Sequence, residues 1–183
     1  LSSDLPDALP PQVDPRQTAL IGAAWTLGSL AALCLTPVGS LTYYETTGWR
    51  GVLEREQVTP HPRFPSLVGA VFPMYHVFAD VGEFAAAAVA PLHSSSPYLV
   101  GMALREDGRT RLLIANLSAA PHLLTLHTQG SYRLRVLDEN SALQAMMQPE
   151  AFRPTGDLHS IAAEGLSLTL LPYAIATLDA VSN

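Results

Sequence analysis

The sequence of 183 residues contains no lysine and few charged residues of any kind. Its ten basic residues are all arginines, sixteen residues are acidic, and charged residues make up 14% of the chain. Binding to nucleic acid by electrostatic attraction needs a concentrated basic surface, which these scattered arginines do not provide. The composition therefore argues against a nucleic-acid partner.

Cysteine is almost absent as well. The single residue Cys34 excludes a disulfide within the chain and lies among alanines and leucines, which predicts a buried thiol. We also find no glycine-rich phosphate loop, no HExxH motif, no Cys/His cluster with zinc spacing and no GxSxG elbow. The sequence therefore predicts no metal and no cofactor, and it fits a reducing, cytoplasmic location.

One long uncharged segment, Gln17–Tyr44, raises the question of a membrane span. Alanine, glycine, serine and threonine dominate it, Pro37 and Gly39 interrupt it, and no arginine cluster flanks it. A helix packed tightly on a sheet explains the small residues better than a bilayer does. The first residues also lack the positively charged region of a signal peptide, so we expect no membrane association.

Two helices are predicted in the first half of the chain. Asp14 and Pro15 form a cap and a first-turn proline, with Gln17 as the capping-box partner, so a helix begins here and runs to about Leu35. A second helix is expected from Gly69 or Pro73 to Val89, where Pro91 ends it.

Residues 40–51, SLTYYETTGWRG, separate the two helices. Residues 40–44 are β-branched, aromatic and uncharged, which predicts a parallel strand covered on both faces, and alternation places Tyr43 and Glu45 on one face and Tyr44 on the other. Glu45 is the acid at the carboxyl end of this strand, where side chains of parallel strands face the ligand. A lone parallel strand forms no sheet, so its partner strands must come from a missing segment or another chain.

From Ser94 onward the hydrophobic period changes from helical to alternating. Turn residues, of which Asp107-Gly108 is the strongest hairpin signal, separate the runs. This spacing predicts an antiparallel sandwich, with residues 141–163 as a loop that contains one short strand at most. The expected strands are Tyr98–Arg105, Arg111–Leu117, His122–Thr128, Tyr132–Asp138, Gly165–Leu171 and Tyr173–Asp179.

Five segments carry a resemblance to a known family. DPRQTALIGAAWTLGSL, SLTYYETTGWRGV and FPSLVGAVFPMYHVFADV resemble the last helix, last strand and final helix of the (β/α)₈ barrel in the D-apionate lactonase family, while LLIANLS and LTLLPYAIATLD resemble the β-sandwich that follows it. The resemblance implies an α/β plus all-β fold. Residues 1–93 would be the last βα elements of a TIM-type barrel, and residues 94–183 an antiparallel β-sandwich.

Five residues are candidates for the site, and each has a structural alternative. Glu45 is the candidate catalytic acid or base, or else a partner of Arg50. The candidate substrate-binding residues are Tyr43, Trp49, Arg50 and His61. Tyr43 either donates its hydroxyl to substrate or fills the barrel; Trp49 stacks on a sugar ring or anchors the loop; Arg50 binds a carboxylate or forms a salt bridge; His61 contacts substrate or lies on the surface.

The resemblance implies a carbohydrate-active hydrolase that acts on a sugar or sugar-acid substrate, most similar to a sugar-acid lactonase. A glycoside hydrolase of the two-glutamate barrel type and a non-catalytic carbohydrate-binding or structural β-sandwich remain alternatives. Related glycosidases carry their catalytic pair on the fourth and seventh strands, which would precede Leu1. The chain therefore resembles the C-terminal portion of an enzyme, and we do not expect it to be active alone.

Overall fold

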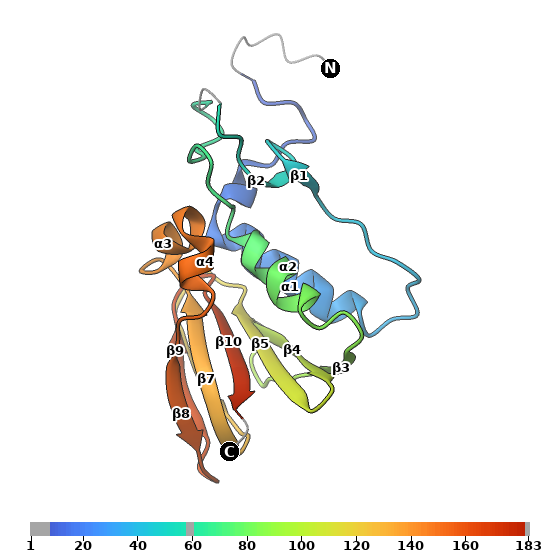
Figure 1. The fold of residues 1–183 in the computed structure, drawn as a ribbon, viewed down its shortest axis with the longest axis vertical. Coiled ribbons are helices and arrows are strands. Elements are labelled where there is room, and N and C mark those ends of the chain that lie inside the picture. Colours follow the sequence, from blue (N-terminus) through green and yellow to red (C-terminus); the bar gives the residue numbers. More distant parts are fainter. Residues whose placement is uncertain (1–7, 58–60, 182–183) are drawn as a thin grey trace.

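The computed structural model describes residues 8–57 and 61–181, which form a central antiparallel sheet with helices on one face and a small second sheet on the other (Figure 1). The lead-in predicted before Asp14 lies partly outside these residues. The helical elements are η1 (Pro15–Thr18), α1 (Leu20–Leu33), α2 (Met74–Gly82), α3 (Ala142–Met147) and α4 (Pro149–Phe152). The strands are β1 (Glu45–Thr47), β2 (Gly51–Leu53), β3 (Ala88–Pro91), β4 (Leu99–Glu106), β5 (Arg109–Asn116), β6 (His122–Leu126), β7 (Gly130–Leu137), β8 (Asp157–Ile161), β9 (Leu166–Leu170) and β10 (Ile175–Val181).

The central sheet has the strand order β3-β4-β5-β10-β7-β8, and all of its pairs are antiparallel. The hairpin between β4 and β5 turns at Asp107 and Gly108, which adopt positive φ angles of 49° and 78°. A two-residue turn with positive φ at both positions matches the twist of the flanking strands, which is why Asp-Gly predicts it correctly. β6 and β9 form the second sheet, and leucines fill the space between the two sheets.

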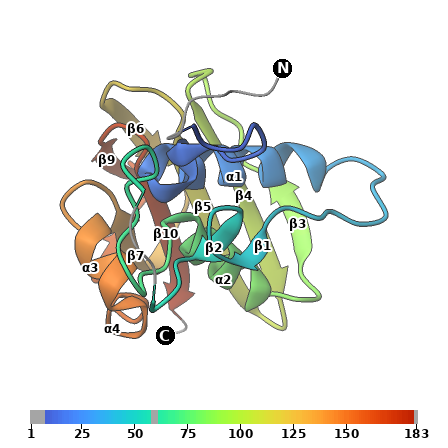
Figure 2. The same ribbon diagram turned by 90° about the horizontal axis from the view of Figure 1, so that it is seen from above.

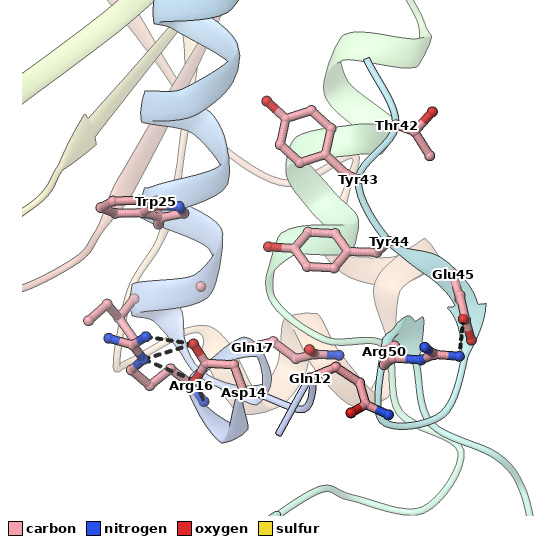
Figure 3. Close-up of a pocket in the computed structure, with 12 residues that line it drawn as sticks. Gln12, Asp14, Arg16, Gln17, Trp25, Thr42, Tyr43, Tyr44, Glu45 and Arg50 are labelled. Atoms are coloured by element: carbon pink, nitrogen blue, oxygen red, sulfur yellow. Dashed lines mark hydrogen bonds and ion pairs between the residues drawn. The ribbon is translucent and has the colours of Figure 1, made fainter. Parts of the chain in front are cut away.

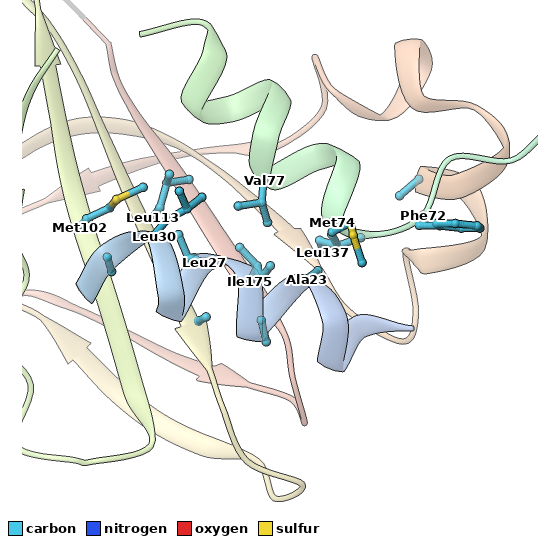
Figure 4. Packing of buried hydrophobic residues seen from close by; sticks show 14 of the residues in the cluster. Ala23, Leu27, Leu30, Phe72, Met74, Val77, Met102, Leu113, Leu137 and Ile175 are labelled. Carbon is cyan, nitrogen blue, oxygen red and sulfur yellow. The ribbon is translucent and has the colours of Figure 1, made fainter. Parts of the chain in front are cut away.

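Helices α1 and α2 lie side by side and pack against the other face of the central sheet (Figures 2 and 4). Leu27 of α1 is fully buried against the core that contains Met102 and Leu113 of the sheet. Burying one such leucine contributes about 1.5–3 kcal/mol. At Gly28 an added Cβ would lie 3.3 Å from the Leu117 side chain, so the small residues of α1 do permit a close approach to the sheet.

A cluster of charged side chains joins α2 to the sheet. Asp80 of α2 accepts hydrogen bonds from Arg135 at 2.6 Å and from Arg153 at 3.0 Å, and its side chain is only 3% exposed. Burial raises the pKa of the neighbouring Glu83, but hydrogen bonds from Arg111 and Arg153 outweigh this effect and lower the pKa below its usual value. We call Asp80, Glu83, Arg111, Arg135, Arg153 and Asp179 the α2 ion cluster.

Several elements differ from the sequence predictions. The second helix ends at Gly82 rather than Val89, because residues 88–91 pair with β4 as strand β3. Two short helices, α3 and α4, occupy part of the region predicted as a loop, and β8 is its single strand. Cys34 is exposed rather than buried because it follows the last turn of α1. Within the described ranges, no helix has both the length and the apolar character that a bilayer span requires.

The triplet Asn116-Leu117-Ser118 matches a glycosylation sequon, but the structure makes its asparagine inaccessible. Asn116 is fully buried, and its Nδ2 donates to the carbonyl oxygens of Ala120, Leu170 and Leu171. This amide is therefore a fixed part of the turn that connects the two sheets, not a modification site.

Candidate functional site

The segment predicted as a parallel strand is extended but not paired. Among the described residues, Ser40–Tyr44 has no ladder partner, and the first strand is the exposed segment β1, which begins only at Glu45. β1 pairs in parallel with β2 of the same segment, with Glu45 opposite Gly51. The predicted strand is therefore displaced toward its carboxyl end, and Glu45 begins the observed strand instead of ending the predicted one.

Tyr43 and Tyr44 point to the same side, contrary to the predicted alternation. The Tyr43 hydroxyl lies 2.8 Å from Ser29 Oγ, and the Tyr44 hydroxyl lies 3.3 Å from Thr26 Oγ1, both on α1 (Figure 3). Both rings also pack on Phe78 of α2. Without neighbouring strands to impose a pleat, contacts with the helices decide where these rings lie.

Glu45 and Arg50 form an ion pair at the end of this segment. Arg50 Nη2 lies 2.5 Å from Glu45 Oε1, and the two side chains are 56% and 52% exposed for Glu45 and Arg50 respectively. The pair faces a cavity of about 540 Å³ between the start of α1 and residues 42–50 (Figure 3). This volume lies within the range of small-ligand sites.

The cavity contains residues that sequence reasoning had not assigned to the site. Asp14 and Arg16 also line the cavity, on the side away from Glu45 and Arg50, and their ion pair places a second carboxylate in the lining. The hydrogen bond from Arg16 lowers the pKa of Asp14. The sequence analysis assigned Asp14 only to helix capping. Because the capping motif already explained this residue, its place in the cavity was not predicted. The full lining is Gln12, Asp14, Arg16, Gln17, Ile21, Gly22, Trp25, Thr42, Tyr43, Tyr44, Glu45 and Arg50.

Gln17 connects the two walls of the cavity. Its Nε2 donates to the carbonyl oxygen of Gly51 at 2.9 Å, in a buried position, instead of completing the capping box predicted with Asp14. Gly51 in turn allows the chain to double back, because an added Cβ would lie 2.5 Å from the backbone of Thr47. The turn of residues 47–51 that carries Arg50 is thus held to η1, which precedes α1.

Trp49 and His61 contact one another but do not line the cavity. Their ring centroids lie 5.3 Å apart, and Trp49 also packs against the buried Phe64 at 6.0 Å. The five predicted residues therefore form two groups in this structure: Tyr43, Glu45 and Arg50 at the cavity, and Trp49 with His61 on the side of the loop.

Glu54 is a buried acid that the sequence analysis did not select. It is 1% exposed, and Oε1 accepts the Arg55 N–H, whereas Oε2 has no hydrogen-bond partner among the described residues. Glu54 is followed by the charged residues Arg55 and Glu56, so the sequence gave no indication that its side chain is buried. In residues 8–57 and 61–181, no three His, Cys, Asp or Glu side chains lie close enough to share a metal ion.

Two family models match the chain. Residues 7–86 match the model described as D-apionate lactonase, TIM barrel domain, and residues 99–178 match the model described as D-apionate lactonase, C-terminal immunoglobulin-like domain. These matches confirm the predicted α/β plus all-β fold class. No curated protein matches the sequence significantly.

Solved structures with a similar fold include xylanases of glycoside hydrolase family 30. An endoxylanase from Clostridium papyrosolvens C71 has a TM-score of 0.60 at 10% identity, over 92% of this chain and 39% of that chain. The subfamily 8 xylanase Xyn30A from Clostridium acetobutylicum has a TM-score of 0.63 at 10% identity, over 90% of this chain and 40% of that chain. The present chain thus spans about two fifths of the length of each xylanase, and this likeness concerns the fold alone.

Proposed function

Because this chain belongs to the D-apionate lactonase family, whose two domain models match residues 7–86 and 99–178, we propose that it is the C-terminal portion of a sugar-acid lactonase. The family resembles carbohydrate-active hydrolases in fold. In this proposal residues 1–93 complete a (β/α)₈ barrel and residues 94–183 form the sandwich. The location would be cytoplasmic.

The observation that carries the proposal is the carboxylate of Glu45, held by Arg50 at a cavity of about 540 Å³. Lactone hydrolysis adds water to the ester carbonyl and breaks the bond between that carbon and the ring oxygen. Glu45 takes a proton from the attacking water and returns it to the departing ring oxygen, which becomes a hydroxyl. The product is a hydroxy acid, and its new carboxylate is a ligand for Arg50.

The remaining barrel strands are part of the proposal. Residues 40–44 have no ladder partner among the described residues, and they lead directly into β1, which begins at Glu45. Unpaired backbone groups cost about 1–3 kcal/mol each when they are buried, so a complete barrel needs strands on both sides of this segment. We propose that these strands come from a segment outside residues 1–183 or from another chain, and that they cover the half-exposed Glu45.

A glycoside hydrolase of the two-glutamate type is the second candidate, and the fold shared with the two xylanases favours it. Such an enzyme needs one carboxyl that is protonated at working pH and a second one about 5 Å away if it is retaining. Asp14 is the other acid of the cavity, but the hydrogen bond from Arg16 lowers its pKa and so keeps it ionised. The protonated acid would therefore have to come from the remaining strands.

A carbohydrate-binding sandwich has less support. Of the aromatic residues predicted there, Tyr132 and Phe152 are buried, Tyr173 is partly buried, and only Tyr98 is exposed, at 52%. One exposed ring does not make the row of aromatic platforms that binds a sugar chain.

The test uses the complete enzyme with the lactone of D-apionic acid and, in parallel, xylan. Glu45→Gln should lower lactone turnover at least about a hundredfold and leave the circular dichroism spectrum unchanged, because glutamine keeps the shape but cannot carry the proton. Trp49→Ala should leave the lactone kinetics unchanged, because Trp49 packs against His61 and Phe64 and does not line the cavity. Glu56→Gln, an exposed acid that does not line the cavity, is the matched control.

Three results would contradict the proposal. If Glu45→Gln unfolds the protein, the segment 40–51 has a structural role and Glu45 is not the catalytic base. If Glu45→Gln is folded but turns over the lactone normally, the catalytic base lies elsewhere in the barrel. Hydrolysis of xylan without hydrolysis of the lactone would favour the glycosidase.

A further inference from the structure

The outer sheet of the sandwich has an open edge. β6 pairs with β9, and among the described residues it pairs with no other strand. Its second edge therefore presents a row of backbone N–H and C=O groups without strand partners. Two-stranded sheets are marginally stable alone, so a further strand on this edge would stabilise the outer sheet.

A cavity of about 460 Å³ runs along this edge. Its lining contains five consecutive residues, 123–127, and on the other side five more, 92–96. Successive side chains of a strand point to opposite faces, so consecutive residues can all line one cavity only if it follows the edge of the strand. The cavity is therefore a slot between β6 and residues 92–96, which we call the β6 slot.

The chemistry of the β6 slot fits a peptide better than a sugar. The side chains of Leu99 and Ile114, which belong to the core between the two sheets, form its apolar floor, while residues 94–96 and Thr125 supply hydroxyls. Among the described residues that line it, none is acidic, an arginine, or a phenylalanine, tyrosine or tryptophan. Sugar sites commonly use an aromatic platform, whereas an added strand needs a main-chain edge and apolar pockets for alternate side chains.

We propose that the β6 slot holds an extended strand of the same protein, supplied by polypeptide outside residues 1–183 and hydrogen-bonded to β6 as a third strand of the outer sheet. The inference rests on the proposed function, which makes this chain one portion of a longer enzyme. The length comparison supports it, because this chain covers only 39% and 40% of the two xylanases. Every second side chain of this added strand points toward the floor of the slot, and these side chains are apolar and uncharged.

The experiment compares hydrogen exchange of the 183-residue chain with that of the same protein extended by the sequence its gene encodes before Leu1. The β6 amides that do not bond to β9 should exchange at least about tenfold more slowly in the extended protein. Leu123 is 72% exposed, so Leu123→Glu should leave the short chain folded, yet place a charge beside the slot and restore fast exchange in the extended protein. Leu158→Glu is the matched control, because Leu158 is 63% exposed on β8, an edge strand of the central sheet that does not line the slot.

Equal exchange in the two forms, or a gene with no strand-forming sequence upstream, would overturn the proposal. Protection of β6 in the short chain by added xylohexaose would show a saccharide site instead. Protection that grows with the concentration of the short chain would show a second copy in the slot. Lactone turnover by the extended protein separates this inference from the proposed function: turnover without protection refutes only the strand, and protection without turnover refutes only the hydrolase.

Discussion

Replacing Asp80 by asparagine should destabilise the protein severely. The Asp80 side chain is 3% exposed and accepts hydrogen bonds from Arg135, Arg153 and Thr177. The α2 ion cluster contains three carboxylates and three arginines, so Asp80→Asn leaves one positive charge uncompensated in a buried site. Removal of one partner from a buried ion pair costs about 3–5 kcal/mol, and we expect about 3 kcal/mol because asparagine keeps one acceptor oxygen.

This loss is large compared with a typical folding free energy of about 5–15 kcal/mol. In a protein of this size it corresponds to a fall in Tm of about 6–12 °C. Urea unfolding followed by circular dichroism measures it directly, with an expected fall in midpoint of at least about 1 M. Asp80 also lies on α2, while its arginines lie on or beside the sheet, so the loss should appear in both the helical and the strand signal.

The exposed pair Glu45–Arg50 provides the control. Glu45→Gln breaks an ion pair whose side chains are about half exposed, so its cost should stay below about 1 kcal/mol. Thr177→Val removes one hydrogen bond to the same Asp80 carboxylate and should cost about 1–2 kcal/mol. If Asp80→Asn is no more destabilising than Glu45→Gln, the reasoning that the α2 ion cluster joins α2 to the sheet is wrong.

Two further predictions concern His76 and Gly51. Burial lowers the pKa of His76. Below about pH 6.5 the unfolded chain therefore binds a proton at this residue that the folded chain does not bind. The free energy of unfolding should fall as the pH drops from about 6.5 toward the pKa of His76 in the folded protein. Urea titrations at pH 7 and pH 5 should therefore show a smaller loss of stability for His76→Gln than for the unmodified protein, and an equal loss would contradict this prediction. Gly51→Ala should cost about 1–3 kcal/mol because the added Cβ meets the Thr47 backbone, whereas Gly39→Ala, with nothing within 4 Å, should be neutral in the same thermal unfolding assay.

Local sequence patterns determined the parts of the fold in which near neighbours decide the conformation. The Asp107-Gly108 turn was predicted correctly because its positive φ angles are a local requirement. Helical spacing predicts that Leu20, Ala24, Leu27, Ala31 and Leu35 share the buried face of the first helix. Ala24, Leu27 and Ala31 are buried, whereas Leu20 is only partly buried and Leu35, which lies beyond the end of α1, is exposed. The pairing of Glu45 with Arg50 was predicted only as the structural alternative to a catalytic role for Glu45, and the observed pair is about half exposed.

Tertiary contacts decided the rest. Tyr43 and Tyr44 share one side because α1 and α2 offer them Ser29, Thr26 and Phe78, which no alternation rule can anticipate.

The same limit applies to the charged groups. Asp80 meets Arg135, Arg153 and Thr177 across 55, 73 and 97 residues of sequence, and Asp14 reaches the cavity of Glu45 only because η1 folds beside it. Burial and pairing over such separations depend on which surfaces pack together, so a single sequence shows the charges but not their partners.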